Sequence, residues 1–369
     1  MLFRQDRLDE AQQAYEEALE WRRRTVGRDD PAVAQVLNNL GELARTRGDT
    51  ETALGFHRQA LDIRERLLGP DHPETAQSLM AIAVLLAEKG RPAEARPFAE
   101  RALAIVERAF GGNDRRVADA AIAVASVAAY LGDLAAAEAH LRRALALYEA
   151  MPAPDPAALR TTLLQLAEVL RRSKRSAEAV PLLERAVALA EPERAPWAPS
   201  AERARIRNDL GVNLFESGEF ERARAELERA VELYDASPGV DAGDSLAALV
   251  NLAAVLAALH ANDAAIATLE RAIRRAEGLP AERRGELARL WNDLGALQFT
   301  MGRFAEAAES LGRAVELAET ASGGDTRGLP LYLRNRAAAL MELDREAEAR
   351  SLIERATRLE KAAAERGGS

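Results

Sequence analysis

The sequence contains no cysteine among its 369 residues. Disulfide bridges and thiolate metal sites are therefore excluded, and the chain is compatible with a reducing compartment. Aromatic residues make up only 4% of the chain, although hydrophobic residues make up 48%. A core of this composition must consist mainly of Ala, Leu and Val, which favours closely packed helices.

Long apolar segments are also missing. A membrane-spanning helix needs a run of about 18 or more apolar residues, and no such uncharged run occurs. The N-terminal sequence MLFRQDRLDE lacks the apolar stretch of a signal peptide. We therefore expect a cytoplasmic protein with no membrane partner.

The chain has no excess of positive charge. Its 50 Lys and Arg residues are outnumbered by 59 Asp and Glu residues, which gives a formal net charge of -9 and a pI of about 5.3. A nucleic-acid surface needs clustered Lys and Arg to neutralise phosphates. The composition argues against a nucleic-acid partner and favours a basic or apolar protein or peptide.

Motifs for catalysis and for cofactor binding are absent as well. The four histidines are His57, His72, His140 and His260, and none has the spacing of a metal site such as HExxH. Neither GxxxxGK[ST], GxSxG nor a GxGxxG that opens a helix after a strand occurs. The many Glu and Arg residues fall at helix-surface positions, where a solvated, ion-paired face explains them. We therefore expect no cofactor, no metal and no enzyme activity within these residues.

What the sequence does contain is a repeated unit, clearest between Leu37 and Pro73. An apolar stripe at i, i+3, i+4, i+7 and i+11 predicts its first helix and comprises Val33, Val36, Leu37, Leu40 and Ala44. A second apolar stripe follows Gly48 and predicts a second helix. Small residues at Gly41, Ala53 and Ala60 allow the two helices to pack closely as a hairpin. One hairpin cannot bury both of its faces, whereas a stack of hairpins can.

Copies of this unit recur at a step of 42 residues, as from Gly48 to Gly90 and Gly132. A second run starts at Gly211, 44 residues after the equivalent Ala167. The predicted organisation is a lone second helix of an incomplete repeat in residues 1–30, four repeats in 31–191, a Pro-rich bend in 192–200, four repeats in 201–360 and a frayed tail in 361–369.

The pattern of Leu40-Gly41, Gly48, Ala53 and Ala60 resembles the tetratricopeptide repeat (TPR). The linker LGPDHP at Leu68–Pro73 is similar to that of the 42-residue variety found in kinesin light chains and many bacterial proteins. The resemblance implies an all-α fold, a right-handed superhelical solenoid of antiparallel helix pairs. HEAT repeats have a similar period, but Gly or Ala at three fixed places fits the TPR hairpin better. The Ala- and Arg-rich composition suggests a bacterial source.

Some residues depart from the family's pattern. Ala83 and Ala125 replace the helix glycine, and Lys174 and His260 replace the turn glycine. Arg336 occupies the place of a buried leucine. An arginine is costly to bury, so we expect the last repeat to pack loosely or to shift its register.

In the resembling family, the stripe of the first helix that lies opposite the core lines a concave groove. The corresponding candidates for a peptide-binding groove are Gln35, Asn38, Asn39, Glu42, Met80, Val84, Ile122, Tyr130, Gln165, Asn208, Asp209, Asn251, Asn292, Asp293, Arg334 and Asn335. Four of these, Met80, Val84, Ile122 and Tyr130, predict an apolar floor.

Asparagines recur along this stripe. Because an asparagine amide both donates and accepts, a ladder of them can pair with the backbone of an extended peptide. The resemblance implies this role for Asn39, Asn251 and Asn335, which match groove asparagines of kinesin light chains. The alternative is that these side chains solvate the helices or tie adjacent repeats together.

The sequence thus favours a non-catalytic scaffold that binds a partner segment in its groove. A second interpretation is the sensor or recruitment arm of a larger effector, such as a kinase, peptidase or ATPase, because the chain opens in the middle of a repeat. A third is self-association through residues 8–19, which lack a neighbour on one side.

Overall fold

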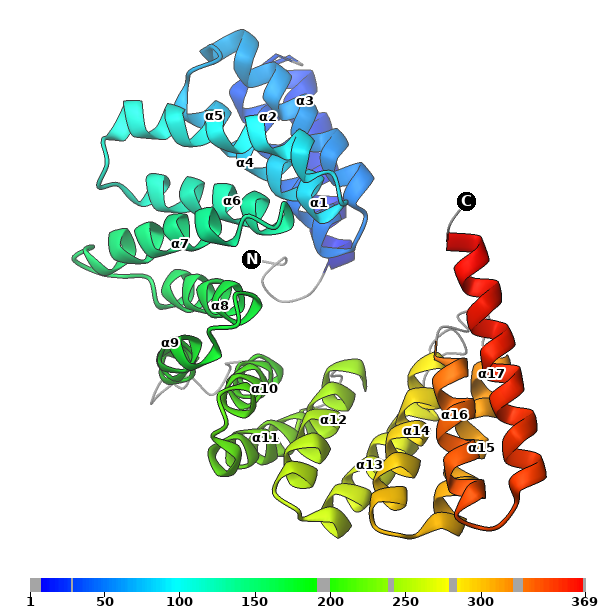
Figure 1. The fold of residues 1–369 in the computed structure, drawn as a ribbon. Helices are drawn as coiled ribbons and strands as arrows, with labels where there is room; N and C mark the ends of the chain where they lie inside the picture. Colours follow the sequence, from blue (N-terminus) through cyan, green and yellow to red (C-terminus); the bar gives the residue numbers. More distant parts are fainter. Residues whose placement is uncertain are drawn as a thin grey trace. The chain divides into compact units, whose positions relative to one another are not determined.

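The computed structural model describes residues 8–27, 29–190, 200–237, 242–278, 284–320 and 328–367. These residues form seventeen α-helices and no strand (Figure 1), which confirms the all-α prediction. The helices are α1 (Leu8–Thr25), α2 (Pro31–Thr46), α3 (Thr50–Leu68), α4 (Pro73–Glu88), α5 (Pro92–Phe110), α6 (Arg115–Tyr130), α7 (Leu134–Glu149), α8 (Pro156–Arg172), α9 (Ser176–Ala190), α10 (Ser200–Glu216), α11 (Phe220–Asp235), α12 (Ala242–Ala258), α13 (Asn262–Ala276), α14 (Arg284–Thr300), α15 (Phe304–Thr320), α16 (Leu329–Met341) and α17 (Glu346–Gly367). Within these ranges, no helix combines the length and the apolarity needed to cross a membrane.

The chain divides into two compact units, Met1–Leu189 and Ala190–Ser369. In each unit, consecutive helices form hairpins, and the second helix of one hairpin packs on the first helix of the next, as α3 does on α4 and α15 on α16. First helices of neighbouring hairpins also touch directly, as α4 and α6 do. This stacking is a solenoid, as predicted, whereas its right-handed path over the whole chain stays a prediction.

The ends of the predicted segments are only partly described. The Pro-rich bend at 192–200 lies outside the described residues, apart from Ser200 in α10. Helix α17 continues to Gly367, within the segment 361–369 that we expected to fray. Helix α1 packs on α2, and its assignment as a lone second helix stays a prediction.

Each hairpin turn places one residue in the left-handed region of the backbone, and some turns add a side-chain cap. The Oδ1 atom of Asp49 accepts a hydrogen bond from the backbone N–H of Thr52 at 3.1 Å, which caps the start of α3. The residue before this cap, Gly48, has φ 80°, in the left-handed region that a tight turn requires. Lys174 and His260 adopt the same conformation, with φ 61° and 59°. Replacing the turn glycine therefore leaves the hairpin intact.

In the hairpins that carry the helix glycine, the contact between the two helices leaves no space for a larger residue. A Cβ atom on Gly295 would lie 2.6 Å from Cγ of Leu311, and one on Gly211 would lie 2.5 Å from Cγ of Leu227. In α2, the same place is taken by Gly41, which lies against the ring of His57. The helix glycine predicted from the sequence is thus the point of closest approach.

The last repeat keeps its register, so the expected shift is wrong. Arg336 is half-buried, and its Cζ atom would lie 3.3 Å from a Cβ atom on Gly312. This glycine in α15 leaves room for the guanidinium. The small residues Ala349 and Ala356 of α17 are fully buried, as in the other hairpins.

We predict that Gly295→Ala lowers the thermal unfolding midpoint, because the new methyl group overlaps Leu311. Overpacking of this kind costs about 1–3 kcal/mol. The control is Gly285→Ala in the same helix, where the added Cβ meets no atom within 4 Å and should raise stability by about 0.5–1 kcal/mol. Equal midpoints for the two variants, measured by circular dichroism, would contradict the close contact.

Candidate functional site

The predicted groove residues lie along the first helices of the hairpins, on the side that we call the first-helix face. In the first unit this face carries four apolar side chains of the adjacent helices α4 and α6. Met80, Val84 and Ile122 are half-buried, and Tyr130 is 54% exposed. We call these four residues the apolar strip. Because α4 packs directly on α6, the strip spans two repeats of one unit.

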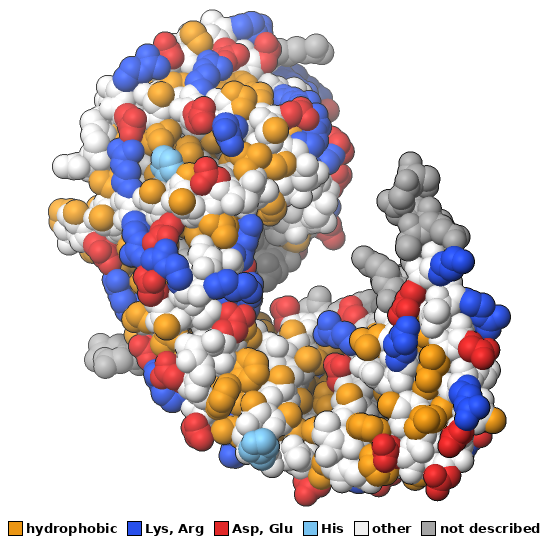
Figure 2. Space-filling model, in the orientation of Figure 1, with side chains coloured by type: hydrophobic (Ala, Val, Ile, Leu, Met, Phe, Trp, Pro, Cys, Tyr) orange, Lys and Arg blue, Asp and Glu red, His pale blue; other side chains and the backbone are white. Residues whose placement is uncertain are grey.

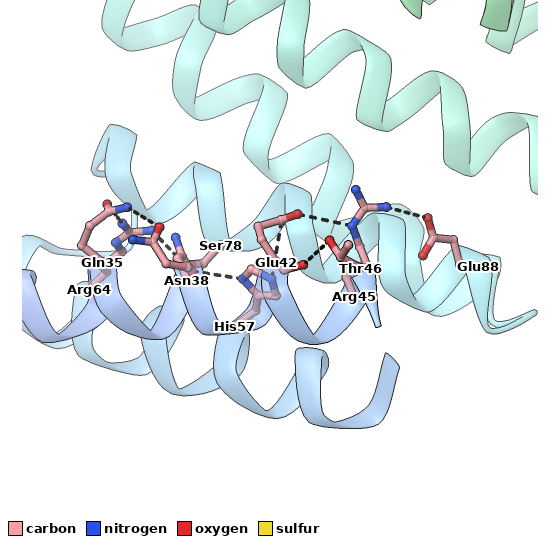
Figure 3. Close-up of polar contacts among 10 residues, drawn as sticks. Gln35, Asn38, Glu42, Arg45, Thr46, His57, Arg64, Ser78 and Glu88 are labelled. Carbon is pink, nitrogen blue, oxygen red and sulfur yellow. Dashed lines mark hydrogen bonds and ion pairs between the residues drawn. The ribbon is translucent and has the colours of Figure 1, made fainter. Parts of the chain in front are cut away.

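Beside the apolar strip, the polar residues of α2 are partly used within the protein (Figure 3). Asn38 is buried, and its Oδ1 atom accepts a hydrogen bond from Oγ of Ser78 at 3.3 Å. Asn39 is half-buried, and its Oδ1 accepts from Nε2 of Gln35 at 3.2 Å. Asn38 therefore joins α2 to α4, whereas Gln35 and Asn39 lie nearer the surface.

A buried arginine that the sequence analysis missed holds this region together. Arg64 of α3 is 0% exposed and donates to Oγ of Ser78 at 3.0 Å and to Oε1 of Gln35 at 3.2 Å. Burial lowers the pKa of the Arg64 guanidinium, because desolvation disfavours the charged form, and Glu74 opposes this effect. The nearest carboxylate oxygen, in Glu74, lies 3.8 Å from its Nε. The signal in the sequence is a charged residue at a repeat position occupied elsewhere by Val106 and Tyr148.

His57 of α3 is another buried polar residue that lies outside the predicted groove residues. Its side chain is 1% exposed, and Nδ1 lies 3.1 Å from Oδ1 of Asn38. An amide oxygen only accepts, so this contact places the imidazole proton on Nδ1. The Nε2 atom has no hydrogen-bond partner and lies 3.7 Å from the carboxylate of Glu42. Burial lowers the pKa of His57, and Glu42 acts in the opposite direction.

In the second unit, the asparagines of the first-helix face bond to one another. Nδ2 of Asn251 donates to Oδ1 of Asn208 at 2.9 Å, which joins α12 to α10. Nδ2 of Asn335 donates to Oδ1 of Asn292 at 2.8 Å, which joins α16 to α14. The two bonds are copies of each other along the chain. They correspond to the alternative in which asparagines tie adjacent repeats together.

The aspartates that directly follow Asn208 and Asn292 in the sequence also take part in these contacts. Nδ2 of Asn292 donates to Oδ1 of Asp293 at 3.4 Å, and Asn208 makes the equivalent contact with Asp209 at 3.5 Å. Burial raises the pKa of Asp293, while Asn292 and Arg289 act against that rise. The pairs α10–α12 and α14–α16 are thus each joined by a short chain of polar contacts in addition to apolar packing.

The two remaining candidates have different surroundings. Gln165 of α8 is half-buried, and its Oε1 atom is buried with no hydrogen-bond partner. Arg334 of α16 is exposed and forms a two-bond ion pair with Glu360, at 3.1 and 2.6 Å. Charged side chains of both signs are interspersed over the visible face of each unit (Figure 2). Among the described residues, no three His, Asp or Glu side chains form a group that could hold a metal ion.

The burial of His57 predicts a pH dependence. Its pKa is lower in the folded protein than the usual value of about 6.5, so the unfolded chain binds the proton more readily and stability falls as the pH decreases below that value. Burial also lowers the pKa of His140, which contributes to the same fall. We expect His57→Leu to reduce the loss of thermal stability between pH 7 and pH 5.

Leucine is the matched replacement, because Leu227 and Leu311 occupy this place against the helix glycine in other hairpins. The control is His260→Asn, which removes an exposed imidazole and should leave the loss unchanged. The expectation fails if both variants lose as much stability on acidification as the unmodified protein.

Comparisons with known proteins agree with this architecture. No curated protein matches the sequence. The apo form of the quorum sensor NprR from B. thuringiensis is 14% identical with a TM-score of 0.60, over 96% of this chain and 99% of that one. The STAND protein PH0952 from Pyrococcus horikoshii, a signal transduction ATPase with a tetratricopeptide repeat sensor, is 13% identical with a TM-score of 0.65, over 97% of this chain and 54% of that one. At such identities, these two likenesses show the fold alone.

The TPR-like repeats of a Podosopora anserina kinesin light chain are 19% identical with a TM-score of 0.47, over 57% of this chain and 100% of that one. The model of the tetratricopeptide repeat family matches residues 1–66, 47–108, 81–150, 116–192, 158–236, 202–278 and 244–320. Because these matches follow one another from residue 1 to residue 320, the chain belongs to the tetratricopeptide repeat family.

Proposed function

We propose that this protein is a non-catalytic scaffold that holds an extended segment of a partner protein against the first-helix face. The observation that carries the proposal is the apolar strip of the first unit. Met80 and Val84 lie on α4 and Ile122 and Tyr130 on α6, and none of the four is fully buried. Apolar side chains of a partner would remove this surface from water.

The edge of the apolar strip offers polar contacts for the same segment. Gln35 is exposed, and Asn39 and Glu42 of the same helix are half-buried. An extended segment alternates its side chains between two sides and leaves backbone groups free to bond. We assign the pairing with those backbone groups to Asn39. The net charge of -9 favours a segment that is basic or apolar.

The second unit contributes less to this proposal. Asn251 and Asn335 already donate to Asn208 and Asn292 at 2.9 and 2.8 Å. A peptide that used these amides would have to replace bonds within the protein, which reduces the net gain. Self-association through residues 8–19 also stays a prediction. Ala11 and Leu19 of that segment are buried in the folded chain, so these two side chains are not available to a second copy.

The test uses peptides selected by display on the whole protein, with their affinities measured by isothermal titration. Tyr130→Ala should weaken binding about tenfold, since tyrosine is among the residues whose truncation at an interface costs more than about 1 kcal/mol. The control is Leu67→Ala, which removes a 44% exposed apolar side chain from the second helix α3. Selected peptides that bind both variants and the unmodified protein equally would overturn the proposal.

A second proposal is that the chain serves as the sensor or recruitment arm of a larger effector, such as a kinase, peptidase or ATPase. It is supported by the likeness of nearly the whole chain to about half of a STAND ATPase that contains a repeat sensor. The test is the intact mass of the protein in the cells that produce it. We expect a mass above 40.0 kDa, and a mass of 40.0 kDa would contradict this proposal.

A further inference from the structure

A cleft of about 800 Å³ lies in the second unit, among α13, α14 and α15. Its floor on α14 is formed by residues at i, i+4, i+7 and i+11, namely Leu287, Trp291, Leu294 and Gln298. With 3.6 residues per turn, this stripe lies on the opposite side of α14 from Asn292 and Asp293. The cleft is therefore separate from the first-helix face.

The floor of the cleft is made of positions that other repeats bury. Trp291 occupies the repeat position of Leu37 and Leu79, which are both 0% exposed. Trp291 is instead half-buried and faces the cleft. Within the part of the chain that the structure describes, Leu287 and Trp291 of this stripe are thus incompletely covered, so an apolar side chain from outside can still remove surface from water.

A small, polar residue lines one wall of the cleft. Ser310 of α15 occupies the repeat position of Phe56 and Phe98, whose rings pack against cores of the first unit. Its hydroxyl donates to Oε1 of Gln298 at 2.8 Å, and both side chains are buried. This bond pairs the hydroxyl of Ser310 with the amide oxygen of Gln298 at the base of the cleft.

The dimensions of the cleft fit a short helix. From Leu287 to Gln298 the floor extends about 16 Å, at 1.5 Å per residue of helix. That length matches about three turns of a helix laid along α14. Leu317 of α15 and Ile273 of α13 provide further apolar contacts on the two walls.

The rim of the cleft is acidic. Its charged residues are Glu270, Glu277, Glu306, Glu309, Glu316, Arg274 and Arg313. Two of the glutamates have arginine partners, since Glu316 pairs with Arg313 at 3.3 Å and Glu306 pairs with Arg303. Glu277 and Glu309 are exposed. The rim therefore complements lysine and arginine side chains on either side of an apolar ridge.

We propose that this cleft docks a short amphipathic helix of a partner protein, with its apolar face on Trp291 and its flanking Lys and Arg residues at the glutamate rim. This site is independent of the scaffold function proposed for the first-helix face. A protein that uses both surfaces would hold two segments at once.

The first test follows the fluorescence of Trp291 in the full chain. The chain has three tryptophans, so Trp21→Phe and Trp197→Phe leave Trp291 as the only tryptophan, and its emission can be excited selectively. The probe is an acetylated 14-residue peptide of about equal Leu and Lys content, with Leu at the helical spacing of one face. Its binding should shift the Trp291 emission to shorter wavelengths as water leaves the cleft. The same peptide with Glu in place of every Lys should cause no shift.

The second test separates the cleft from the overall charge. The double variant Glu277→Lys and Glu309→Lys should weaken binding of the Leu/Lys peptide about tenfold. The matched control is Glu221→Lys and Glu354→Lys, which makes the same charge change at exposed positions of α11 and α17 and should weaken binding less than about twofold. Equal weakening by both variants would overturn the proposal, as would calorimetric binding without a change in Trp291 emission. Tyr130→Ala should leave this binding unchanged, so failure here and failure of the proposed scaffold function are distinguishable.

Discussion

In every hairpin, two helices approach each other at positions where only glycine or alanine fits. The second-helix alanine of this contact is fully buried in all eight hairpins, at Ala60, Ala102, Ala144, Ala186, Ala230, Ala272, Ala314 and Ala356. Because the closest contact is made by backbone and methyl groups, the two helices of a hairpin can approach each other closely. Each hairpin then presents its second apolar side to the next one, and all first helices of a unit lie along the same face. Both proposed binding surfaces depend on this arrangement.

Polar side chains join neighbouring repeats in two different ways. In the first unit, Arg64 of α3 and Asn38 of α2 both bond to Ser78 of α4, so a buried charge and an amide link three helices. In the second unit, asparagines of neighbouring first helices bond to each other. A buried polar group that loses its partner is costly, so these contacts favour one neighbour and one register over others. These bonds also engage amides that a bound peptide could otherwise use, so the proposed recognition relies more on the apolar strip.

The two candidate surfaces have complementary properties. The apolar strip lies on first helices of the first unit and borders the polar residues of α2, as an extended segment requires. The cleft in the second unit lies on the other side of α14, has an acidic rim and matches the dimensions of a helix. A solenoid can carry both, because each repeat contacts only its neighbours and a local change of side chain alters one surface without disturbing the rest.

The sequence by itself determined the helices, the hairpin turns and the side of each helix that a residue occupies. Helical periodicity and the small residues at Gly41, Ala53 and Ala60 are local signals, and even the turns at Lys174 and His260 followed from the step of 42 residues. Only the tertiary structure decided which residues on the outer stripe remain accessible, because periodicity gives a direction around the helix axis and not the distance to the neighbouring helix. Asn38 is therefore buried by α4, while Tyr130 on the same face is exposed. The burial of Arg64 and the cleft above Trp291 were decided in the same way, by how closely side chains from different repeats fill the space between them.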